Sequence, residues 1–556
     1  MNIRNLSKMK RELYILIVIA MAVPSAILAQ TANDTIRRTV LVESVYNPVI
    51  ASSEKRSFLP DEQRPAVQRE AVVYADQSYD PGNLARSPLG TATTTLREER
   101  LLPAYLRLGY GIRNNVDVLG LYRAALGKND VLDLGASVTG WSGTIPYKNL
   151  LWLNDDTWQS RRYDTDVHIG YNHHGRTRFG VQADMGYYTR NFLVALAQIP
   201  HDTDLQNSLH YGGNAFVNTP LGQTPFELGV NGGFHRWQNS SWLGQEQPNA
   251  ENHAHLDGRL AYRTQRTGRI EAVLTGDYIN YDNLPDSLRH LYLGFHPSWT
   301  LKGKQTLLTL GVNADVASGN NRRIQLSPNC RLAWTPSAPL RFDIVVDGGQ
   351  DLHTFRDIYR ISPWAAESPL GNTYTYVNAQ LHMGFRLAEG LHLGTGGGYR
   401  ITDGALFASD GTGGALLQTR LFNHDAHVWN IVADASYEWK DLYRLKADFI
   451  YYGWQADDAV PALLSYAPQM DVNVALRARI VRGLHADASF RFRQFCETSA
   501  GRKDAVADLS LKADYALNRV MSVYLSGKNL LNRHSGFCPV YPAQGIHVIG
   551  GVTLKL

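Results

Sequence analysis

Apolar and polar positions alternate with a period of two along most of the chain, from 104 to 556. One run places an apolar side chain at every second position from Trp429 to Trp439, with polar side chains such as Asp434 and Glu438 between them. The next runs repeat this pattern. Because successive side chains of a β-strand point to opposite faces, each run predicts a strand with one apolar face and one charged face.

Two architectures use such strands. A soluble sandwich packs the apolar faces together, with the large aromatic side chains mostly in its core. A membrane barrel turns the apolar faces to lipid, collects aromatic side chains at the two interfaces and lines a wet lumen with the polar faces. The runs are about 9–12 residues long, which is the length that a tilted strand needs to cross a bilayer. Strands of soluble proteins average about 5–6 residues.

The connections between the runs favour the barrel, because short and long segments alternate. The short connections lie at 127–128, 172–175, 301–303, 388–390, 440–441 and 481–483. The long ones lie at 141–163, 189–208, 237–251, 351–373, 401–426, 453–469 and 531–545. Outer-membrane barrels have short periplasmic turns and long external loops. We therefore predict an all-β fold, a transmembrane antiparallel β-barrel of about 22 strands with a short non-globular N-terminal segment.

The N-terminus has the features of a secretory signal peptide. Positive residues end at Arg11, an apolar run covers 13–23, and Ala29 offers a small residue for cleavage. The alternative is an anchoring helix, which needs about 20 apolar residues. Because Pro24 cuts the run short, we expect 1–29 to direct export and to be removed.

The segment 30–103 differs from the rest of the chain. It is polar, and prolines interrupt it throughout: Pro48, Pro60, Pro65, Pro81, Pro88 and Pro103. Few long elements can form between prolines at this spacing. We interpret 30–103 as an extended periplasmic or lumenal segment and 104–556 as the barrel, with the protein in the outer membrane of the cell.

Composition changes this picture little. Of the 556 residues, 44% are hydrophobic and 19% charged, and the net charge of +4 is small. A small net charge, made up of both basic and acidic residues, implies no nucleic-acid partner. The 29 tyrosines and 11 tryptophans, against 7 methionines, agree with aromatic bands at two membrane interfaces.

The C-terminal stretch resembles a known family. Residues 526–533 have the sequence Ser-Gly-Lys-Asn-Leu-Leu-Asn-Arg, and a glycine-containing apolar strand then ends the chain at Leu556. This resembles the closing hairpin of TonB-dependent outer-membrane receptors, in which an N-L-[LF] segment ends the penultimate strand. The last strand, with Gly551 and Leu554, also resembles the signal that the barrel-assembly machinery recognises, although that signal normally ends in an aromatic residue. The resemblance implies a transport barrel in outer-membrane lipid.

The chain also departs from that family. Members carry a globular plug ahead of the barrel, and 30–103 is too short for it. One β-prone run in this segment is similar to a TonB box: Thr39, Val40, Leu41, Val42 and Glu43. Such boxes are loose motifs, so contact with TonB is left open.

The polar faces of the last strands carry the main candidate site. We expect eleven charged side chains to line the lumen there: Arg444, Lys446, Asp448, Arg477, Arg479, Asp487, Arg491, Arg493, Asp508, Lys512 and Asp514. One interpretation is a ladder of ion pairs between neighbouring strands. The alternative is a selective pore lining, and the mixture of signs predicts no strong preference for anions or cations.

Other chemistry has weak support. His253 and His255 share a strand face, but no third ligand lies near them in sequence, and a catalytic zinc site needs three. We therefore predict no metal site and no cofactor. No serine, histidine and aspartate set stands at a strand end, so we do not expect an enzyme.

The three cysteines are Cys330, Cys496 and Cys538. The strand parity puts Cys496 and Cys538 on neighbouring external hairpins, and export exposes them to an oxidising compartment. We predict a disulfide between these two, provided that their Cα atoms come within about 7 Å. Cys330 falls on an alternating apolar face and is predicted to be free and to face lipid.

The predicted function is passage of an unknown solute across the outer membrane. The alternative is a non-transporting scaffold in an outer-membrane assembly or export machine. An open barrel of about 22 strands would leak, so 30–103, folded-in external loops or a partner protein must fill it. A surface lipoprotein and a periplasmic protein are the candidate partners, besides the barrel-assembly machinery.

Overall fold

The computed structural model describes residues 103–146, 157–194, 205–240, 250–264, 268–282, 288–318, 324–365, 368–411, 416–440, 442–455, 466–497, 503–534 and 541–556. The signal-peptide and TonB-box predictions lie outside these residues, and so does the predicted segment 30–103 except for Pro103. Strands dominate the described part, and no helix within it is long and apolar enough to cross a membrane.

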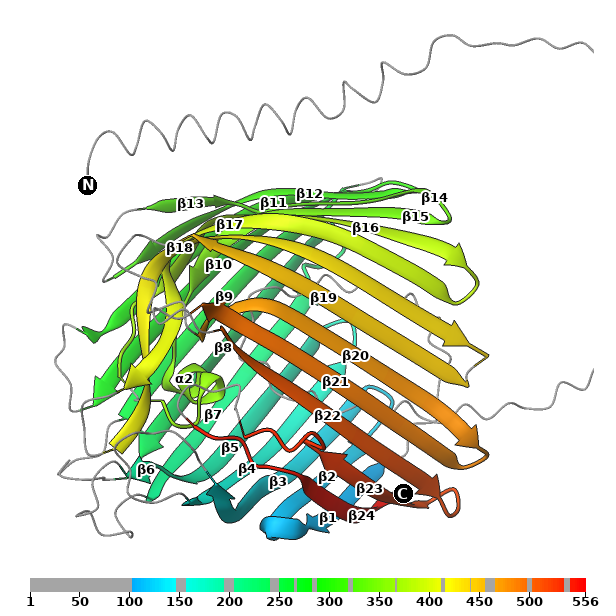
Figure 1. Ribbon diagram of the computed structural model, residues 1–556. Coiled ribbons are helices and arrows are strands. Elements are labelled where there is room, and N and C mark those ends of the chain that lie inside the picture. Colours follow the sequence, from blue (N-terminus) through cyan, green and yellow to red (C-terminus); the bar gives the residue numbers. More distant parts are fainter. Residues whose placement is uncertain are drawn as a thin grey trace, which may run out of the picture. The chain divides into compact units, whose positions relative to one another are not determined.

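Strands follow one another along the chain, with one short 3-10 helix and one short α-helix between them (Figure 1). They are β1 (Ala104–Gly111), η2 (Ile112–Asn114), β2 (Asn115–Ala125), β3 (Asp130–Pro146), β4 (Thr157–His174), β5 (Arg178–Asn191), β6 (Leu193–Val194), β7 (Leu205–Pro220), β8 (Phe226–Asn239), β9 (Ala250–Arg263), β10 (Gly268–Asp282), β11 (His290–Lys302), β12 (Thr306–Ala317), β13 (Gln325–Pro328), β14 (Cys330–Ser337), β15 (Leu340–Asp351), α2 (Phe355–Ile361), β16 (Thr373–Ala388), β17 (Leu391–Gly411), β18 (Leu416–Trp439), β19 (Tyr443–Gln455), β20 (Pro468–Val481), β21 (Leu484–Glu497), β22 (Lys503–Ala516), β23 (Met521–Lys528) and β24 (His547–Lys555).

The strands close into one antiparallel barrel. Each strand pairs with its neighbours in sequence, and β1 also pairs with β24, from Tyr105 opposite Lys555 to Gly111 opposite Ile549. β13 and β14 are two parts of one strand beside β12, and β6 pairs only with β18. The barrel formed by the described residues therefore has 22 strands, which confirms the predicted fold class and strand number. Figure 1 shows the blue N-terminal strands beside the red C-terminal ones.

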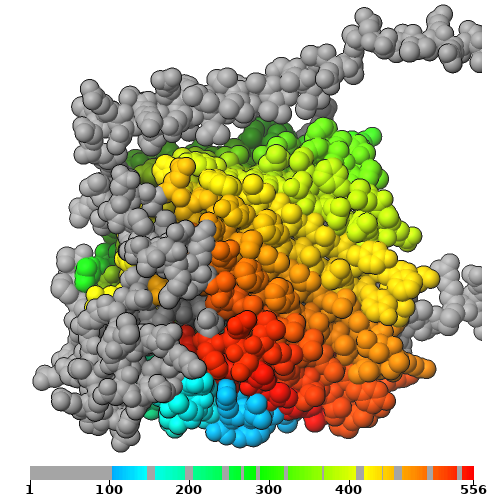
Figure 2. Space-filling view, in the orientation of Figure 1, coloured from blue at the N-terminus to red at the C-terminus, as the bar shows by residue number. Residues whose placement is uncertain are grey.

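The outer face of the barrel is apolar. In β10, Leu274 and Tyr278 are exposed on this face, whereas Ile279 and Tyr281 are buried on the inner face. Exposed aromatic side chains gather near the short turns: Tyr122, Phe179, Trp299, Trp334, Trp439 and Tyr515. In Figure 2 the described strands form a continuous outer surface from green to red. An apolar surface bounded by aromatics is what a barrel presents to lipid, so the protein is an outer-membrane β-barrel.

Short hairpins lie at one end of the barrel and long connections at the other (Figure 1). Several predicted boundaries were wrong, and two examples show why. The turn predicted at 172–175 lies at 175–177, because His173 belongs to the strand and stacks on Phe179 with ring centroids 4.9 Å apart. The loop predicted at 401–426 is mostly strand, since β17 and β18 stay paired out to Gly411.

Candidate functional site

The connection between β15 and β16 folds into the barrel instead of extending away from it. Its centre is the short helix α2, which lies within the ring of strands (Figure 1). Thr354 caps the helix: its hydroxyl accepts from the Asp357 N–H at 3.2 Å, and the Asp357 carboxylate accepts from the Thr354 N–H at 3.3 Å. This capping box satisfies backbone donors that a helix start leaves unpaired. We call 352–372 the α2 segment.

Apolar packing fixes α2 against the inner wall. Phe355 and Ile358 are 0% and 1% exposed, and they belong to one buried cluster with Tyr188 of β5, Trp237 of β8 and Ile279 of β10. Burying large apolar side chains is favourable by about 1.5–3 kcal/mol each. The cluster therefore anchors the segment to wall strands that lie far from it in sequence.

Polar contacts reinforce this docking. The Phe355 N–H donates to Glu251 of β9, 3.0 Å from each carboxylate oxygen. The Tyr359 hydroxyl donates to the Asp164 carboxylate of β4, and burial raises the pKa of that phenol, so the donor keeps its proton. The Arg190 guanidinium lies 4.9 Å from the centre of the Tyr359 ring.

An aromatic stack holds the far end of the segment. The rings of Trp364 and Tyr541 are stacked with centroids 4.5 Å apart, and Trp158 packs edge-on against both. The Trp364 indole N–H donates to the Asn191 carbonyl at 3.0 Å. The α2 segment is thus attached to the wall both by α2 itself and by this stack.

A cavity of about 240 Å³ remains between α2 and the wall. Its lining combines four histidines of β7–β9 with arginine and acidic side chains: His210, His235, His253, His255, Arg236, Glu251, Arg356, Asp357 and Arg360, besides Trp237 and Thr354. Imidazole rings line up across the strands, with His235 stacked on His210 and on His255 at centroid distances of 5.5 and 5.8 Å. We call this space the histidine cavity.

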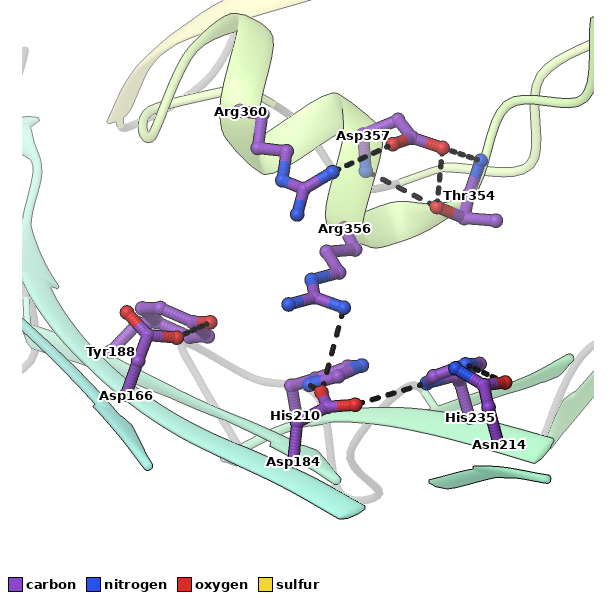
Figure 3. Close-up of polar contacts among 10 residues, drawn as sticks. All are labelled: Asp166, Asp184, Tyr188, His210, Asn214, His235, Thr354, Arg356, Asp357 and Arg360. Atoms are coloured by element: carbon purple, nitrogen blue, oxygen red, sulfur yellow. Dashed lines mark hydrogen bonds and ion pairs between the residues drawn. The ribbon is translucent and has the colours of Figure 1, made fainter. Parts of the chain in front are cut away.

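A carboxylate beside this cavity lies next to two of these rings (Figure 3). Asp184 Oδ2 lies 3.0 Å from His210 Nδ1 and 3.5 Å from the Arg356 guanidinium, and Asp184 Oδ1 lies 3.9 Å from His235 Nδ1. Figure 3 shows Arg356 pointing from α2 toward this carboxylate. The helix therefore covers the cluster and contributes a cation to it.

Of the residues that line the cavity, the sequence singled out only His253 and His255. His253 and His255 do share the inner face, but His253 Nε2 lies 2.8 Å from its own partner, Asp277. Asp184, His210 and His235 were missed, because they come from three strands and meet only through the register. Two glycines were a partial signal in the sequence. Gly212 lies opposite His235 and Gly233 lies opposite His255 on the neighbouring strands, and the missing side chains make room for the rings.

The eleven charged residues predicted to line the lumen share one face of β19–β22, opposite the face with the exposed apolar side chains. Four of them form ion pairs with neighbouring strands at hydrogen-bond distance. Arg477 lies 2.7 Å from Asp487, Arg444 lies 2.8 Å from Glu438, and Arg493 lies 2.6 Å from Asp471. These contacts support the ladder interpretation.

The others are spread along the same face. Arg491 lies opposite Asp508, Lys512 opposite Asp487, and Lys512 Nζ lies 5.1 Å above the Tyr524 ring. Asp508 accepts from the Asn529 N–H at 3.0 Å. No ion pair at this distance is recorded for Lys446, Asp448, Arg479 or Asp514 in the described residues; of these, Asp448 lies opposite Asp434, and Arg479 opposite His485.

The structure describes two of the three cysteines. Cys330 begins β14 opposite Val346, on the face of the exposed Trp334 and Ile344. Cys496 ends β21, but Cys538 lies outside the described residues. The disulfide therefore stays a prediction.

Comparison with solved structures identifies the barrel type. The fold is similar to the FrpB iron transporter of Neisseria meningitidis, with 11% identity over 83% of this chain and 82% of that chain and a TM-score of 0.62. The siderophore receptor PirA of Acinetobacter baumannii matches with 10% identity over 83% and 81%, also at 0.62. The copper transporter OprC matches with 12% identity over 82% and 81%, at 0.59. No protein-family profile and no curated protein sequence matches the chain.

At these identities the similarity concerns the fold. The chain has the 22-strand barrel of the TonB-dependent receptors, which confirms the resemblance seen in its closing hairpin.

Proposed function

We propose that the barrel passes a solute across the outer membrane and that the α2 segment is a constriction in its path. The observation that carries this proposal is the inward-folded α2, buried against the wall strands β5, β8 and β10. A scaffold protein has no need of a helix inside its lumen, whereas a passage needs a closure that can be removed. Folded-in loops were one of three candidates for filling the barrel.

The rest of the lumen would be lined by the charged face of β19–β22 and filled in part by the segment 30–103. The charged face of β19–β22 would form the wet side of the passage, because it carries acidic and basic side chains, some of them in ion pairs. The segment 30–103 would occupy space beside that face, and TonB would act on 39–43 if the passage is energised.

Conductance in a planar bilayer tests the proposal. The full-length protein is compared with a variant in which 353–371 is replaced by a flexible glycine-serine linker and with a second variant that lacks 30–95. We expect the linker variant to conduct more than the intact protein, and the deletion of 30–95 to raise conductance further when the two are combined. Unboiled protein should migrate faster than boiled protein on gels in every case, which shows that the barrel still closes.

A matched control separates passage from damage. The same linker is placed in the long connection 456–465, whose replacement leaves the α2 segment intact. If both linkers raise conductance equally, or if neither does, the α2 segment is not the constriction. The scaffold alternative predicts no conductance change from any of these variants.

A further inference from the structure

Two histidines that line the histidine cavity and a carboxylate beside them have the geometry of a metal site. One ligand atom from each of Asp184, His210 and His235 lies within 4.8 Å of the others. The two closest pairs are separated by 3.0 and 3.9 Å. Ligand atoms around a tetrahedral ion with bonds of about 2.0–2.1 Å are about 3.3 Å apart. Small rotations of the side chains are enough to bring all three onto one ion.

The atoms that would bind an ion have no hydrogen-bond partner. His210 is 2% exposed, and within the described residues neither of its nitrogens makes a hydrogen bond; the same holds for Asp184 Oδ2 and His235 Nδ1. His210 Nδ1 and Asp184 Oδ2 are close, but they do not meet in hydrogen-bonding geometry. Buried polar atoms are nearly always satisfied. Three side chains that converge on one point and carry such unsatisfied atoms therefore indicate a ligand between them.

A neighbouring side chain orients one of the rings. His235 Nε2 lies 3.2 Å from the Asn214 side-chain oxygen, which is an acceptor, so this nitrogen carries the ring proton. The lone pair is then on Nδ1, the nitrogen nearest to Asp184. Metal-binding histidines commonly donate their other ring N–H to an oxygen in this way.

A glycine leaves the space between the ligands open. Gly212 of β7 lies directly between Asp184 of β5 and His235 of β8 in the strand register. A Cβ atom at this position would collide with the His235 ring. The absent side chain lets a carboxylate and an imidazole on strands that are not adjacent face each other.

The charges of the cavity favour a cation over an anion as the ligand. Each arginine of the lining is near a carboxylate: Arg236 is 2.8 Å from Asp282, Arg360 is 3.7 Å from Asp357, and Arg356 is 3.5 Å from Asp184. The unsatisfied atoms are instead nitrogens and oxygens that carry lone pairs. Arg356 supplies a positive charge at the carboxylate that an ion would otherwise neutralise.

The geometry points to a binding site for one divalent transition-metal ion, held by Asp184, His210 and His235 on the inner wall beneath α2. Two imidazoles and a carboxylate suit ions such as Zn²⁺, Co²⁺, Ni²⁺ and Cu²⁺ rather than Ca²⁺ or Mg²⁺. Three protein ligands leave a coordination position for water. The ion replaces Arg356 as the partner of Asp184. This site does not depend on the proposed passage of a solute.

Metal binding to the full-length protein, purified in detergent without a polyhistidine tag, tests the inference. Zn²⁺ affinity is measured by calorimetry, and Co²⁺ serves as a probe because its visible absorption reports nitrogen ligands and coordination number. We expect one ion per chain. Asp184→Asn and His210→Gln should each weaken Zn²⁺ binding by more than about tenfold, and Asn214→Ala by about tenfold, which is typical of a supporting residue.

Two further variants sharpen the result. Arg356→Gln removes the competing cation and should tighten Zn²⁺ binding, although it leaves all three ligands in place. The matched control is His382→Gln, which removes a wall histidine that lies 2.6 Å from Asp434 but belongs to no cluster of three in the described residues; it should bind Zn²⁺ like the parent. Migration of unboiled protein on gels checks that each variant is folded.

Three outcomes would contradict the inferred metal site. Equal Zn²⁺ affinity in the parent, Asp184→Asn and His210→Gln would show that the ion binds elsewhere or adventitiously. A Co²⁺ spectrum typical of six oxygen ligands would exclude the histidines. Binding of inorganic phosphate that competes with Zn²⁺ and is lost in Arg356→Gln would favour an anion site instead.

Discussion

The inner wall of the barrel has two contrasting regions. Along β5–β10 the inward positions include Tyr188, Trp237 and Ile279, which are 5%, 2% and 1% exposed under the α2 segment. Along β19–β22 the inward positions carry charges, such as the pair of Arg477 and Asp487, with both side chains 36% exposed. Both regions alternate with the same period and present the same kind of apolar outer face.

The difference shows that the polarity of the inward side chains indicates whether a protein segment or water covers that part of the wall. Large apolar side chains are unfavourable in a wet lumen, so a wall with inward aromatics needs a segment packed on it. A wall of paired charges tolerates water. The α2 segment accordingly contacts the aromatic wall, and the charged wall is left for water, for 30–103 or for a partner.

The largest expected effect comes from removing an anchor of the covered wall. Phe355→Ala should loosen α2 by about 3–5 kcal/mol, because it empties a fully buried site. The helix carries Arg356 and Arg360, so trypsin cleavage there reports its release, with rates that follow the open population. We expect cleavage to accelerate more than about 100-fold, since about 1.4 kcal/mol corresponds to tenfold. Leu381→Ala, at an exposed outer position, should leave cleavage unchanged; similar rates in all three proteins would contradict the docking.

The next effect concerns the other wall. Arg493 and Asp471 are 4% and 8% exposed, and their side chains meet at 2.6 Å. Arg493→Met leaves Asp471 with a buried charge and should destabilise the barrel by about 3 kcal/mol. Urea unfolding followed on unheated gels measures this loss. Trypsin cleavage of α2 should not change, and an increase would show that the two walls are coupled.

A disulfide between Cys496 and Cys538 is a smaller effect at the external ends of the charged wall. It would stabilise these hairpins by about 2 kcal/mol, at the lower end of the usual range. Mass spectrometry of non-reduced peptides identifies the bond. If both cysteines are alkylated without prior reduction, the prediction is wrong.

The smallest effect is a pH dependence of the covered wall. Burial lowers the pKa of His353, which precedes α2 and lies near Asp357 and His290. The docked segment therefore binds fewer protons than the released one, and docking weakens as the pH falls below about 6.5. From about pH 7.5 to about pH 5.5, cleavage of α2 should accelerate by less than about tenfold per pH unit. His353→Gln should weaken this dependence, and an equal dependence in both proteins would exclude His353 as one of its sources.

Much of the fold could be predicted from the sequence because barrel strands pair with their neighbours in the chain. Alternation and the parity of the turns are local patterns, and they predicted the 22 strands and the outer face. The site depends on distant contacts. Thr354 and Asp357 have the spacing of a capping box, yet nothing local indicates that α2 turns inward to meet Glu251, 104 residues away. The meeting of Asp184, His210 and His235 likewise needed the register of three strands.

Photo-crosslinking from α2 in intact cells tests the central claim most directly. A benzophenone amino acid at Arg356 should crosslink to peptides of β7 and β8, which contain His210 and His235, because that side chain lines the histidine cavity. The same amino acid at Arg477, on the charged wall, should give no crosslink to the α2 segment. Crosslinks from position 356 only to other proteins, or to the charged wall, would contradict the account.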